Sequence, residues 1–314
     1  MVKAICLFSG GLDSLLAVKL LQEQSIEIIL LHLTSVFEKT ITNPFKNLKI
    51  ITKDITKEQL KLIKNPKYGY GSAINPCIDC KILMFKIANK YMKKLKASFV
   101  FTGEVLGERP MTQNKGAMLL IQKKSGLKSK LLRPLSAKLL EETEPEKKGY
   151  VDRNKLLSIY GRSRKIQLEL AKRYKLKEFP TPAGGCLLTD IPLSKKLKDL
   201  IKHKKSITYK DLELLKIGRH FRLNKSKIIV GRKEEENKKL LKLKDKADYT
   251  FEVADCVGPI TILQGEKTKK AVELAAALTA EYSDAKGEKI MVNCNKKKII
   301  VKPIDKQKAL KYKI

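Results

Sequence analysis

Along the first 190 residues, short apolar runs alternate with segments in which apolar residues recur at helical spacing. The apolar runs predict strands at 3–8, 26–34, 48–56, 98–104 and 130–135. The helical spacing predicts helices after the first run, at 80–97 and at 162–176. Strands that alternate with helices are typical of a parallel α/β sheet covered by helices on both faces. We therefore predict an α/β fold for this part.

The pattern changes after residue 190. A Lys-rich segment leads into short strands that are expected to pair as hairpins, and a helix is predicted at 267–282. This mixture indicates a smaller α+β module. The expected organisation is an N-terminal domain at 1–190, a basic linker at 191–215, a second domain at 216–305 and a tail at 306–314.

The charge of the chain is strongly positive in both parts. The 314 residues include 67 Lys and Arg against 33 Asp and Glu, a formal net charge of +34. Such a positive field suits a polyanionic partner, because neutralised phosphates release counterions. The alternative is a Lys-rich composition without a binding role, in which lysine occupies whichever positions solvent permits.

Targeting signals and cysteine usage predict where the protein works. The N-terminal stretch "MVKAICLFSGGLDS" reaches glycine after a short apolar run and does not resemble a signal peptide. No apolar stretch reaches the roughly 18 residues that a membrane span requires. Six scattered cysteines indicate a reducing compartment, so we predict a cytoplasmic protein without a membrane partner.

The stretch "SGGLDS", residues 9–14, lies between the first predicted strand and its helix. Gly10 and Gly11 allow backbone N–H groups to approach an anion, and the helix start adds its unsatisfied N–H groups and positive dipole end. Ser9 and Ser14 add hydroxyl donors, while the lysine of a Walker A loop is absent. The alternative is a tight Gly-Gly turn without a ligand.

This stretch closely resembles the PP-loop of ATP pyrophosphatases, which split ATP between the α and β phosphates. The resemblance implies an adenine nucleotide alpha hydrolase-like fold and a loop that holds the pyrophosphate. It also implies that Asp13 orients Mg²⁺ or the phosphates, and that Thr34, at the end of the second strand, meets the adenosine.

A second motif, "FTGEVLGERPMTQ" at 101–113, resembles a signature of the PP-loop domain of ThiI, the tRNA 4-thiouridine synthase family. Gly103, Glu104, Gly107 and Gln113 match that signature, and Thr112 stands where serine is usual. The stretches "LLRPL" and "CIDCKILMFKIA" resemble that family's next strand and its cysteine helix. The four ordered motifs cover roughly residues 3–190, and they imply that ATP is the cofactor and tRNA the substrate.

Two departures from ThiI bear on the mechanism. The sequence shows no counterpart of the family's N-terminal RNA-binding domains or of its C-terminal rhodanese domain, so the RNA grip and the sulfur relay are expected elsewhere. The stretch "NPCIDCK" is also similar to the N-P-D-x-x-C of bacterial tRNA 2-thiouridylases, in which an acid stands at the position of Cys77. Replacement at C4 and at C2 of uridine therefore both remain open.

The pair Cys77 and Cys80 raises the question of a metal. Tetrahedral zinc takes four protein ligands, and the chain has no second C-x-x-C and no histidines at ligand-like spacing. Cys186 in "PAGGC" resembles the second cysteine segment of RNA thiolases. The three thiolates would give a [4Fe–4S] cluster three ligands and leave one iron open for a hydrosulfide. The rival is a Cys80/Cys186 persulfide pair without iron; Cys6 is expected in the core.

The stretch "GRHFRLNKSKIIVGRKEEENKKLL" at 218–241 resembles, more weakly, the RNA-associated NFACT-R family. The resemblance implies a basic RNA-binding face. Its expected members are Arg219, His220, Arg222, Lys225, Lys227 and Arg232. The alternative is a solvated Lys-rich surface.

Together these resemblances imply a tRNA sulfurtransferase. ATP would adenylate a uridine carbonyl, and sulfur from Cys80, Cys186 or a cluster would displace AMP, with Asp13 as the third catalytic residue. A cysteine desulfurase or sulfide would supply the sulfur. The alternatives are a ligase of the same fold that acts on a small molecule, and a non-catalytic RNA-binding protein.

Overall fold

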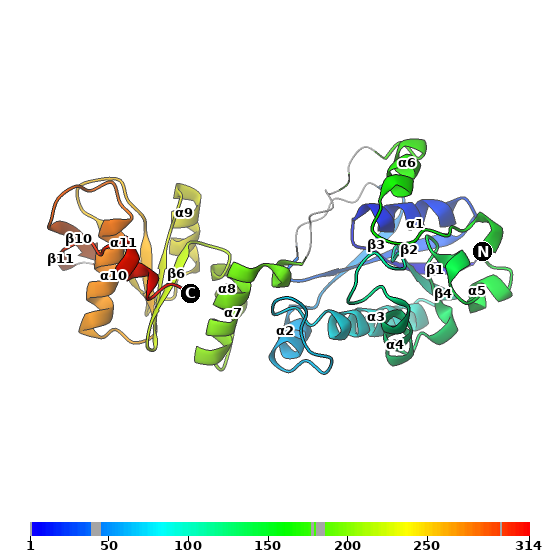
Figure 1. The fold of residues 1–314 in the computed structure, drawn as a ribbon, viewed down its shortest axis with the longest axis horizontal. Coiled ribbons are helices and arrows are strands. Elements are labelled where there is room, and N and C mark those ends of the chain that lie inside the picture. Colours follow the sequence, from blue (N-terminus) through cyan, green and yellow to red (C-terminus); the bar gives the residue numbers. More distant parts are fainter. Residues whose placement is uncertain (1, 39–44, 177–178, 180–185, 296) are drawn as a thin grey trace. The chain divides into compact units, whose positions relative to one another are not determined.

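The chain folds as two compact units, residues 1–189 and 190–314. The computed structural model describes residues 2–38, 45–176, 179, 186–295 and 297–314. Figure 1 shows helices and strands mixed in both units. Each unit has its own sheet and its own hydrophobic core.

The N-terminal unit is built on a five-stranded parallel sheet in the order β3-β2-β1-β4-β5. The strands are β1 (Lys3–Leu7), β2 (Glu27–Thr34), β3 (Lys49–Asp54), β4 (Phe99–Thr102) and β5 (Leu131–Leu132). Buried apolar runs form the central strands, as expected where both faces are covered. The prediction of a parallel α/β sheet is confirmed.

Helices cover both faces of this sheet. Successive residues of β1 point to opposite faces, and each set packs against a different helix. Ala4 and Cys6 pack in one core with α1 (Leu12–Gln22), whereas Ile5 and Leu7 pack in another with α3 (Cys77–Lys94). The remaining helices of the unit are α2 (Thr56–Lys64), α4 (Lys115–Ser125), α5 (Glu144–Lys147) and α6 (Lys165–Arg173). Figure 1 shows α1 and α6 on one face and α3 and α4 on the other.

The strand order reverses between β1 and β4, since the chain runs outward to β3 and then returns to add β4 on the other side of β1. In open parallel sheets, ligands bind at the carboxyl ends of the strands beside such a reversal. The stretch 9–14 follows β1 and the stretch 103–113 follows β4, so both motifs lie at this edge.

The C-terminal unit contains an antiparallel sheet in the order β11-β10-β8-β9-β7-β6. The strands are β6 (Arg219–Leu223), β7 (Ser226–Val230), β8 (Tyr249–Val253), β9 (Thr261–Gln264), β10 (Ile290–Cys294) and β11 (Lys297–Val301). Helix α10 (Lys269–Glu281) packs on one face, and α9 (Glu234–Leu243) shares a core with residues of the other. The predicted α+β module is confirmed.

The segment 191–215, expected as a linker, is helical. It forms α7 (Ile191–His203) and α8 (Tyr209–Leu214) and belongs to the second unit. Leu193, Leu197 and Leu200 are buried at helical spacing, which gives α7 an apolar stripe against the unit. Lysines occupy several of the exposed positions of α7. Because lysine is so abundant in this segment, the helical spacing of the leucines was not recognised in the sequence.

The segment 306–314, expected as a tail, is also part of the fold. Helix α11 (Lys306–Leu310) starts at Asp305, whose side chain accepts from the N–H groups of the first turn. The N–H of Arg222 donates to the carbonyl of Tyr312, and the N–H of Ile314 donates to the carbonyl of His220. The last residues therefore satisfy backbone groups of the edge strand β6.

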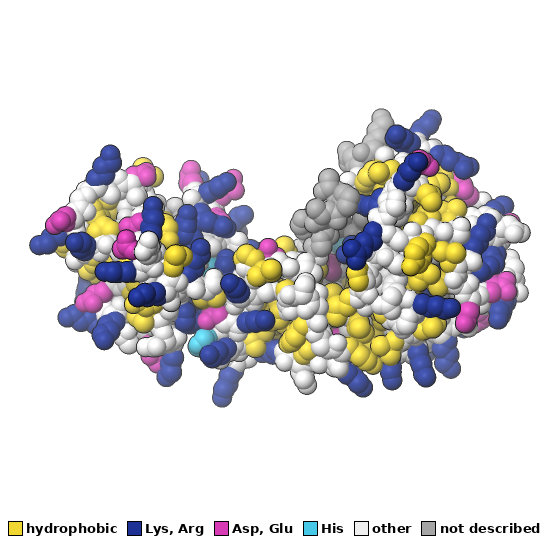
Figure 2. All heavy atoms as spheres, viewed as in Figure 1, with side chains coloured by type: hydrophobic (Ala, Val, Ile, Leu, Met, Phe, Trp, Pro, Cys, Tyr) yellow, Lys and Arg dark blue, Asp and Glu magenta, His cyan; other side chains and the backbone are white. Residues whose placement is uncertain are grey.

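Lys and Arg side chains are spread over the surfaces of both units (Figure 2). No local basic tail accounts for the net charge. Among the helices that the structure describes, none is long and apolar enough to cross a membrane.

Candidate functional site

The loop between β1 and α1 has the backbone that anion binding requires. Gly10 has a φ of 71°, which favours glycine, and Gly11 is the N-cap residue of α1 without a side-chain cap. The Ser14 hydroxyl donates to the Gly11 carbonyl at 2.7 Å, and the Ser9 hydroxyl lies 3.3 Å from that of Ser14. The uncapped helix start and the two hydroxyls surround a position suited to phosphate oxygens.

Gly103 joins the second motif to this loop. A Cβ on Gly103 would lie 2.4 Å from the carbonyl carbon of Asp13 and 2.4 Å from the nitrogen of Ser14. Only glycine allows this contact, so the end of β4 packs directly on the start of α1. The two motifs that the sequence placed at one sheet edge are in van der Waals contact there.

Asp13 lies among charged side chains. Its Oδ2 is 3.8 Å from an Arg164 nitrogen, and its Oδ1 is buried without a hydrogen-bond partner. Burial raises the pKa of Asp13, although the positive charges of Arg164 and Arg109 oppose the shift. Burial also raises the pKa of Glu108, and the Asp13 charge adds to that effect. Two neighbouring carboxylates, one with an unpartnered oxygen, are suited to a hard cation held with phosphate.

Glu104, the residue after Gly103, is buried between two cations. Its Oε1 lies 3.1 Å from the Lys81 ammonium, and its Oε2 accepts from the Arg133 Nε at 3.0 Å. Burial alone would raise the pKa of Glu104, but Lys81 and Arg133 outweigh it and hold the pKa below its usual range. Glu104 therefore stays ionised and binds these two side chains, and the nucleotide contact that the ThiI resemblance implies for it stays a prediction.

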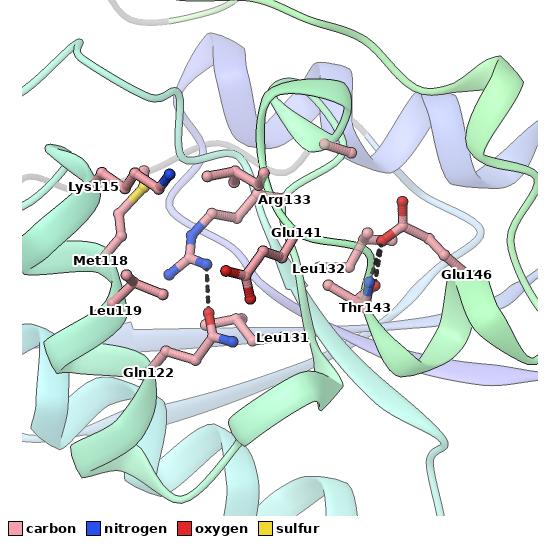
Figure 3. A pocket seen from close by; sticks show the side chains of 12 residues that line it. Lys115, Met118, Leu119, Gln122, Leu131, Leu132, Arg133, Glu141, Thr143 and Glu146 are labelled. Carbon is pink, nitrogen blue, oxygen red and sulfur yellow. Dashed lines mark hydrogen bonds between the residues drawn. The ribbon is translucent and has the colours of Figure 1, made fainter.

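Arg133 extends this network to a small cavity of about 50 Å³ beside β5 and α4. Its Nη1 donates to the Gln122 side-chain oxygen at 2.7 Å, and Figure 3 shows its guanidinium between Gln122 and Glu141. Apolar side chains of Met118, Leu119 and Leu131 complete much of the wall. None of the sequence-predicted site residues lines this cavity, which is connected to the site only through the contact of Arg133 with Glu104.

The thiols of Cys77, Cys80 and Cys186 share one electrostatic neighbourhood, although Cys186 is far away in sequence. Cys77 accepts from the Asn75 amide at 3.1 Å, and Cys80 accepts from the Gln59 amide at 3.6 Å. The N–H of Leu187 donates to the carbonyl of Phe37 at 2.9 Å, which holds the segment after Cys186 beside the end of β2. Residues 182–185 of "PAGGC" lie outside the described residues.

Burial makes the thiols of Cys80 and Cys186 weaker acids. It raises the pKa of Cys80 to about 12 and that of Cys186 to about 11, and in each case another thiol of the group adds to the shift. Glu38 also raises the pKa of Cys186, and burial raises the pKa of Glu38 itself to about 7. The predicted core position of Cys6 is correct, since that thiol is fully buried in β1.

The metal prediction depends on the positions of these side chains. Within the described ranges, no group of three or more His, Cys, Asp or Glu side chains is arranged to hold a metal ion. The three thiols are therefore close enough to influence one another but do not have the geometry of a cluster site. The [4Fe–4S] cluster stays a prediction.

Thr34 and Gln113 complete the sequence-predicted nucleotide residues. Thr34 ends β2 half-buried, and its carbonyl accepts from the N–H of Ile55. Gln113 is buried, its carbonyl accepts from the N–H of Gly107 at 2.7 Å, and its Oε1 has no partner. Thr34 is the last residue of β2 and Gln113 lies in the segment after β4, and the contact of each with a nucleotide stays a prediction.

The predicted RNA-binding face is not one uniform surface. Lys227 is buried at 5% exposure, and His220 is buried at 1%, so neither lies on the surface. Arg222 binds Asp199 with two nitrogens, one of them at 2.9 Å, and Arg232 binds Glu236 at 2.7 Å. The burial of Lys227 and His220 corrects the predicted set at these two positions, whereas Arg232 is exposed and its RNA contact stays a prediction.

The other two predicted residues differ in exposure. The Arg219 guanidinium lies over the Tyr282 ring at 4.5 Å and is half-buried. Lys225 is well exposed and forms a surface ion pair with Glu266 at 3.0 Å. Exposed lysines on the edge strand β11 and just after it, Lys297, Lys298 and Lys302, offer further cations that the sequence did not single out.

Sequence reasoning also missed several charged residues of the N-terminal site. Lys81 and Arg133 stood inside quoted motifs, but no local pattern indicates that both bind Glu104. Arg164 stands in the Arg-rich start of a predicted helix, which is a weak signal for contact with Asp13. No sequence pattern singles out Glu38, because its interaction with the Cys186 thiol joins segments that are distant in sequence.

Two family models match the chain, one in each of its two units. Residues 1–142 match the family model described as thiamine biosynthesis protein (ThiI). Residues 218–313 match the model described as NFACT protein RNA binding domain. The chain joins a ThiI domain to an NFACT RNA-binding domain. Both suspected resemblances are thus confirmed.

Curated relatives share the ThiI part. A probable tRNA sulfurtransferase of Methanocaldococcus jannaschii is 31% identical over 122 residues, and one of Thermococcus kodakarensis is 29% identical over 119 residues. Each alignment covers 34% of this chain and 30% of the relative. The chain thus spans less than a third of the length of these relatives.

Two solved structures are similar to the chain at low TM-scores. The C-terminal part of the fibronectin/fibrinogen-binding protein from Streptococcus suis gives 0.30 at 14% identity, covering 82% of this chain and 90% of that one. NMN synthetase from Francisella tularensis gives 0.26 at 15% identity, covering 58% and 89%.

Proposed function

We propose that the protein is a tRNA sulfurtransferase that uses ATP to activate a uridine carbonyl and then replaces its oxygen with sulfur. The observation that carries the proposal is the contact of Gly103 with the backbone of Asp13 and Ser14. This contact joins the phosphate-binding loop to the segment that leads, through Glu104 and Lys81, to Cys80. A nucleotide edge and a group of thiols within one unit suit an activation followed by sulfur transfer.

In the proposed reaction, the loop at 9–14 binds the phosphates of ATP with backbone N–H groups and hydroxyls. The uridine carbonyl oxygen bonds to the α-phosphorus, and pyrophosphate leaves with the electron pair of the broken bond. Mg²⁺ would neutralise charge on the phosphates, and the unpartnered Asp13 Oδ1 is the protein oxygen best suited to contact it. Thr34 and Gln113 are proposed to contact the nucleotide at the same edge.

Sulfur transfer is assigned to Cys80 and Cys186. Both side chains are half-buried, and burial raises the pKa of each thiol, which disfavours the reactive thiolate until sulfur is delivered. Cys80 would carry the sulfur as a persulfide, loaded by a cysteine desulfurase. The outer sulfur would add to the activated carbon, and AMP would leave with the electron pair of the carbon–oxygen bond. The Cys186 thiolate would then attack the Cys80 sulfur, releasing the thiocarbonyl and forming a Cys80–Cys186 disulfide that an external thiol reduces. Sulfide is the alternative donor, as a nucleophile that adds directly to the activated carbon without a persulfide.

The cluster alternative has its own test. About four iron and four sulfide ions per chain after anaerobic purification, lost on substitution of Cys77, Cys80 or Cys186 but not of Cys6, would support a [4Fe–4S] cluster. Metal-free protein that still transfers sulfur would instead support the thiol pair.

The C-terminal unit is proposed to bind tRNA through exposed cations. Phosphate contacts dominate such binding and depend on accessible Lys and Arg side chains. Lys225 and the β11 lysines meet that condition, whereas the buried Lys227 does not.

The deciding experiment incubates the full chain with ATP, a sulfide source and unmodified tRNA. We expect AMP and a thiolated uridine, identified by mass spectrometry of the digested tRNA. AMP formation that depends on a small molecule and not on tRNA would favour a ligase. Binding of tRNA without any ATP cleavage would favour a non-catalytic RNA-binding protein.

A further inference from the structure

Tyr160 is the most exposed aromatic residue among those that the structure describes, at 68%. Single exposed apolar side chains are common on protein surfaces, so exposure alone assigns no role. The backbone that carries Tyr160, however, pairs with the second motif of the candidate site. Its ring therefore has a defined place beside that motif.

The segment around Tyr160 is hydrogen-bonded to residues that follow β4. Tyr160 and Leu106 form a parallel β-bridge, and the N–H of Gly161 donates to the carbonyl of Leu106 at 2.8 Å. The Ser136 hydroxyl accepts from the N–H of Leu106 at 2.9 Å and donates to the carbonyl of Ile159 at 2.7 Å. These bonds order the segment before a ligand arrives, which lowers the entropic cost of binding.

Gly107 of the second motif makes room for the Tyr160 ring. A Cβ on Gly107 would lie 3.0 Å from the Tyr160 Cε2 and 3.2 Å from the Gly161 nitrogen. The φ of Gly107 is 82°, which also favours glycine. One part of the ring therefore lies directly on the motif, and the rest of it is open to solvent.

The chain on both sides of this contact leads to the phosphate-binding loop. Gly103, which precedes Gly107 in the motif, packs on the backbone of Asp13. Arg164, which follows Tyr160, lies 3.8 Å from the Asp13 carboxylate. Four residues of extended chain span at most about 14 Å, so the Tyr160 Cα is within about 14 Å of the Arg164 Cα. A base stacked on the ring would thus lie near the bound phosphates.

The charge around the ring suits RNA. The stretch "YGRSRK" at 160–165 contains Arg and Lys but no acid, and Arg162 and Lys165 are exposed. Proteins that recognise RNA sequence splay unpaired bases out and stack them on aromatic side chains, while cations bind the phosphates. This stretch combines both kinds of contact. It lies beyond residue 142, where the match to the ThiI model ends.

We propose that Tyr160 is a specificity-determining residue whose ring stacks on the target uridine of tRNA. The role rests on the proposed function. Stacking holds the base out of the RNA helix at the nucleotide edge, and the ring takes no part in making or breaking bonds. Because a base inside a duplex has no free face, Tyr160 selects uridines that are unpaired or easily unpaired.

The test compares Tyr160→Ala, Tyr160→Phe and the control Tyr150→Ala, which removes another exposed tyrosine of the same unit. We expect Tyr160→Ala to lower kcat/KM for tRNA-dependent AMP formation by about 10- to 100-fold, because base–aromatic stacking is lost. The Kd of ATP should change by less than about twofold, since Tyr160 contacts the RNA only. Tyr160→Phe keeps the ring and should recover most of the loss, and Tyr150→Ala should match the wild type.

A second measurement separates stacking from support of the motif. Mass spectrometry of the wild-type product locates the target uridine, and a tRNA with an abasic site at that position lacks only the base. We expect the wild type to bind the abasic tRNA about tenfold more weakly than intact tRNA, and Tyr160→Ala to bind both alike. If Tyr160→Ala instead weakens the binding of both tRNAs equally, the ring only supports the motif, and the proposal is overturned.

The outcomes for the function and for Tyr160 are distinct. A wild-type protein that thiolates no uridine of tRNA overturns both. An active wild type whose Tyr160→Ala variant keeps kcat/KM within about threefold overturns only the role of Tyr160.

Discussion

Each unit holds a largely buried carboxylate that binds an arginine, and the two differ in what lies next to them. In the N-terminal unit, Glu104 binds Lys81 and Arg133 and adjoins the glycine that packs on the phosphate-binding loop. In the C-terminal unit, Asp199 of α7 binds Arg222 of β6, with the His203 ring 3.2 Å away. The first network meets the candidate site, and the second joins a helix to a sheet.

The difference shows that ion-pair chemistry alone does not identify a site. Glu104 is bound by two cations, Lys81 and Arg133, and it lies at the carboxyl ends of parallel strands, where ligands bind in such sheets. Asp199 instead anchors α7, together with Lys196, whose ammonium donates to the carbonyls of Leu215 and Gly218. The location within the fold decides which network is available for chemistry.

The largest effect should come from the N-terminal site itself. We expect Asp13→Asn to lower tRNA-dependent AMP formation by about 100- to 1000-fold, because the carboxylate charge that would hold Mg²⁺ against the phosphates is removed. Affinity for tRNA, measured by filter binding, should change by less than about twofold. Glu142→Gln, an exposed acid of the same unit, serves as the control. An equal loss of tRNA affinity and turnover would contradict the division between the units.

The second effect concerns the scaffold role of Asp199. We expect Asp199→Asn to destabilise the C-terminal unit by about 3 kcal/mol, since Arg222 would be left without its partner. Hydrogen exchange of the β6 and β7 amides measures the loss, and ATP cleavage should stay unchanged. The exposed pair of Lys225 and Glu266 is the control, because Glu266→Gln should cost less than about 0.5 kcal/mol. Protection that survives in Asp199→Asn would show that α7 is held by its leucines alone.

Local patterns in the sequence were sufficient to predict the N-terminal architecture. Buried apolar runs and helical spacing are short-range signals, and the glycines at 10 and 11 indicate an anion loop by their lack of side chains. The convergence of Lys81 and Arg133 on Glu104 could not be predicted in this way. It depends on three strands and helices that are distant in sequence.

The errors in the C-terminal part have a common cause. Lysine was taken as a sign of exposure, yet Lys227 lies in β7, which has a neighbouring strand on each side and is buried along its whole length. The same assumption made α7 look like a linker, although leucines recur among its lysines. A long aliphatic stem allows lysine to occupy positions that its charge would not suggest.

The third prediction uses this buried lysine. Burial lowers the pKa of Lys227 to about 8 from an ordinary value of 10.5, so the folded state loses the proton first as the pH rises. The cost of the buried ammonium is therefore full below pH 8 and disappears between about pH 8 and pH 10.5. We expect Lys227→Met to stabilise the unit by about 2 kcal/mol at pH 7, with the gain shrinking over that window. Thermal unfolding as a function of pH measures this gain, and a gain that does not vary with pH would contradict the assignment.

The smallest effect tests which unit binds tRNA. We expect the variant Lys297→Gln/Lys298→Gln/Lys302→Gln to weaken tRNA binding several-fold, because these exposed lysines of the C-terminal unit can reach phosphates. The slope of log K against log salt should fall by about 0.9 for each phosphate that the variant no longer neutralises. The matched control, Lys86→Gln/Lys90→Gln/Lys93→Gln, removes the same charge from the exposed face of α3 in the N-terminal unit. If both triple variants weaken binding equally, the general positive field holds the RNA. If only the variant of the C-terminal unit binds tRNA more weakly, the C-terminal unit provides the tRNA-binding surface.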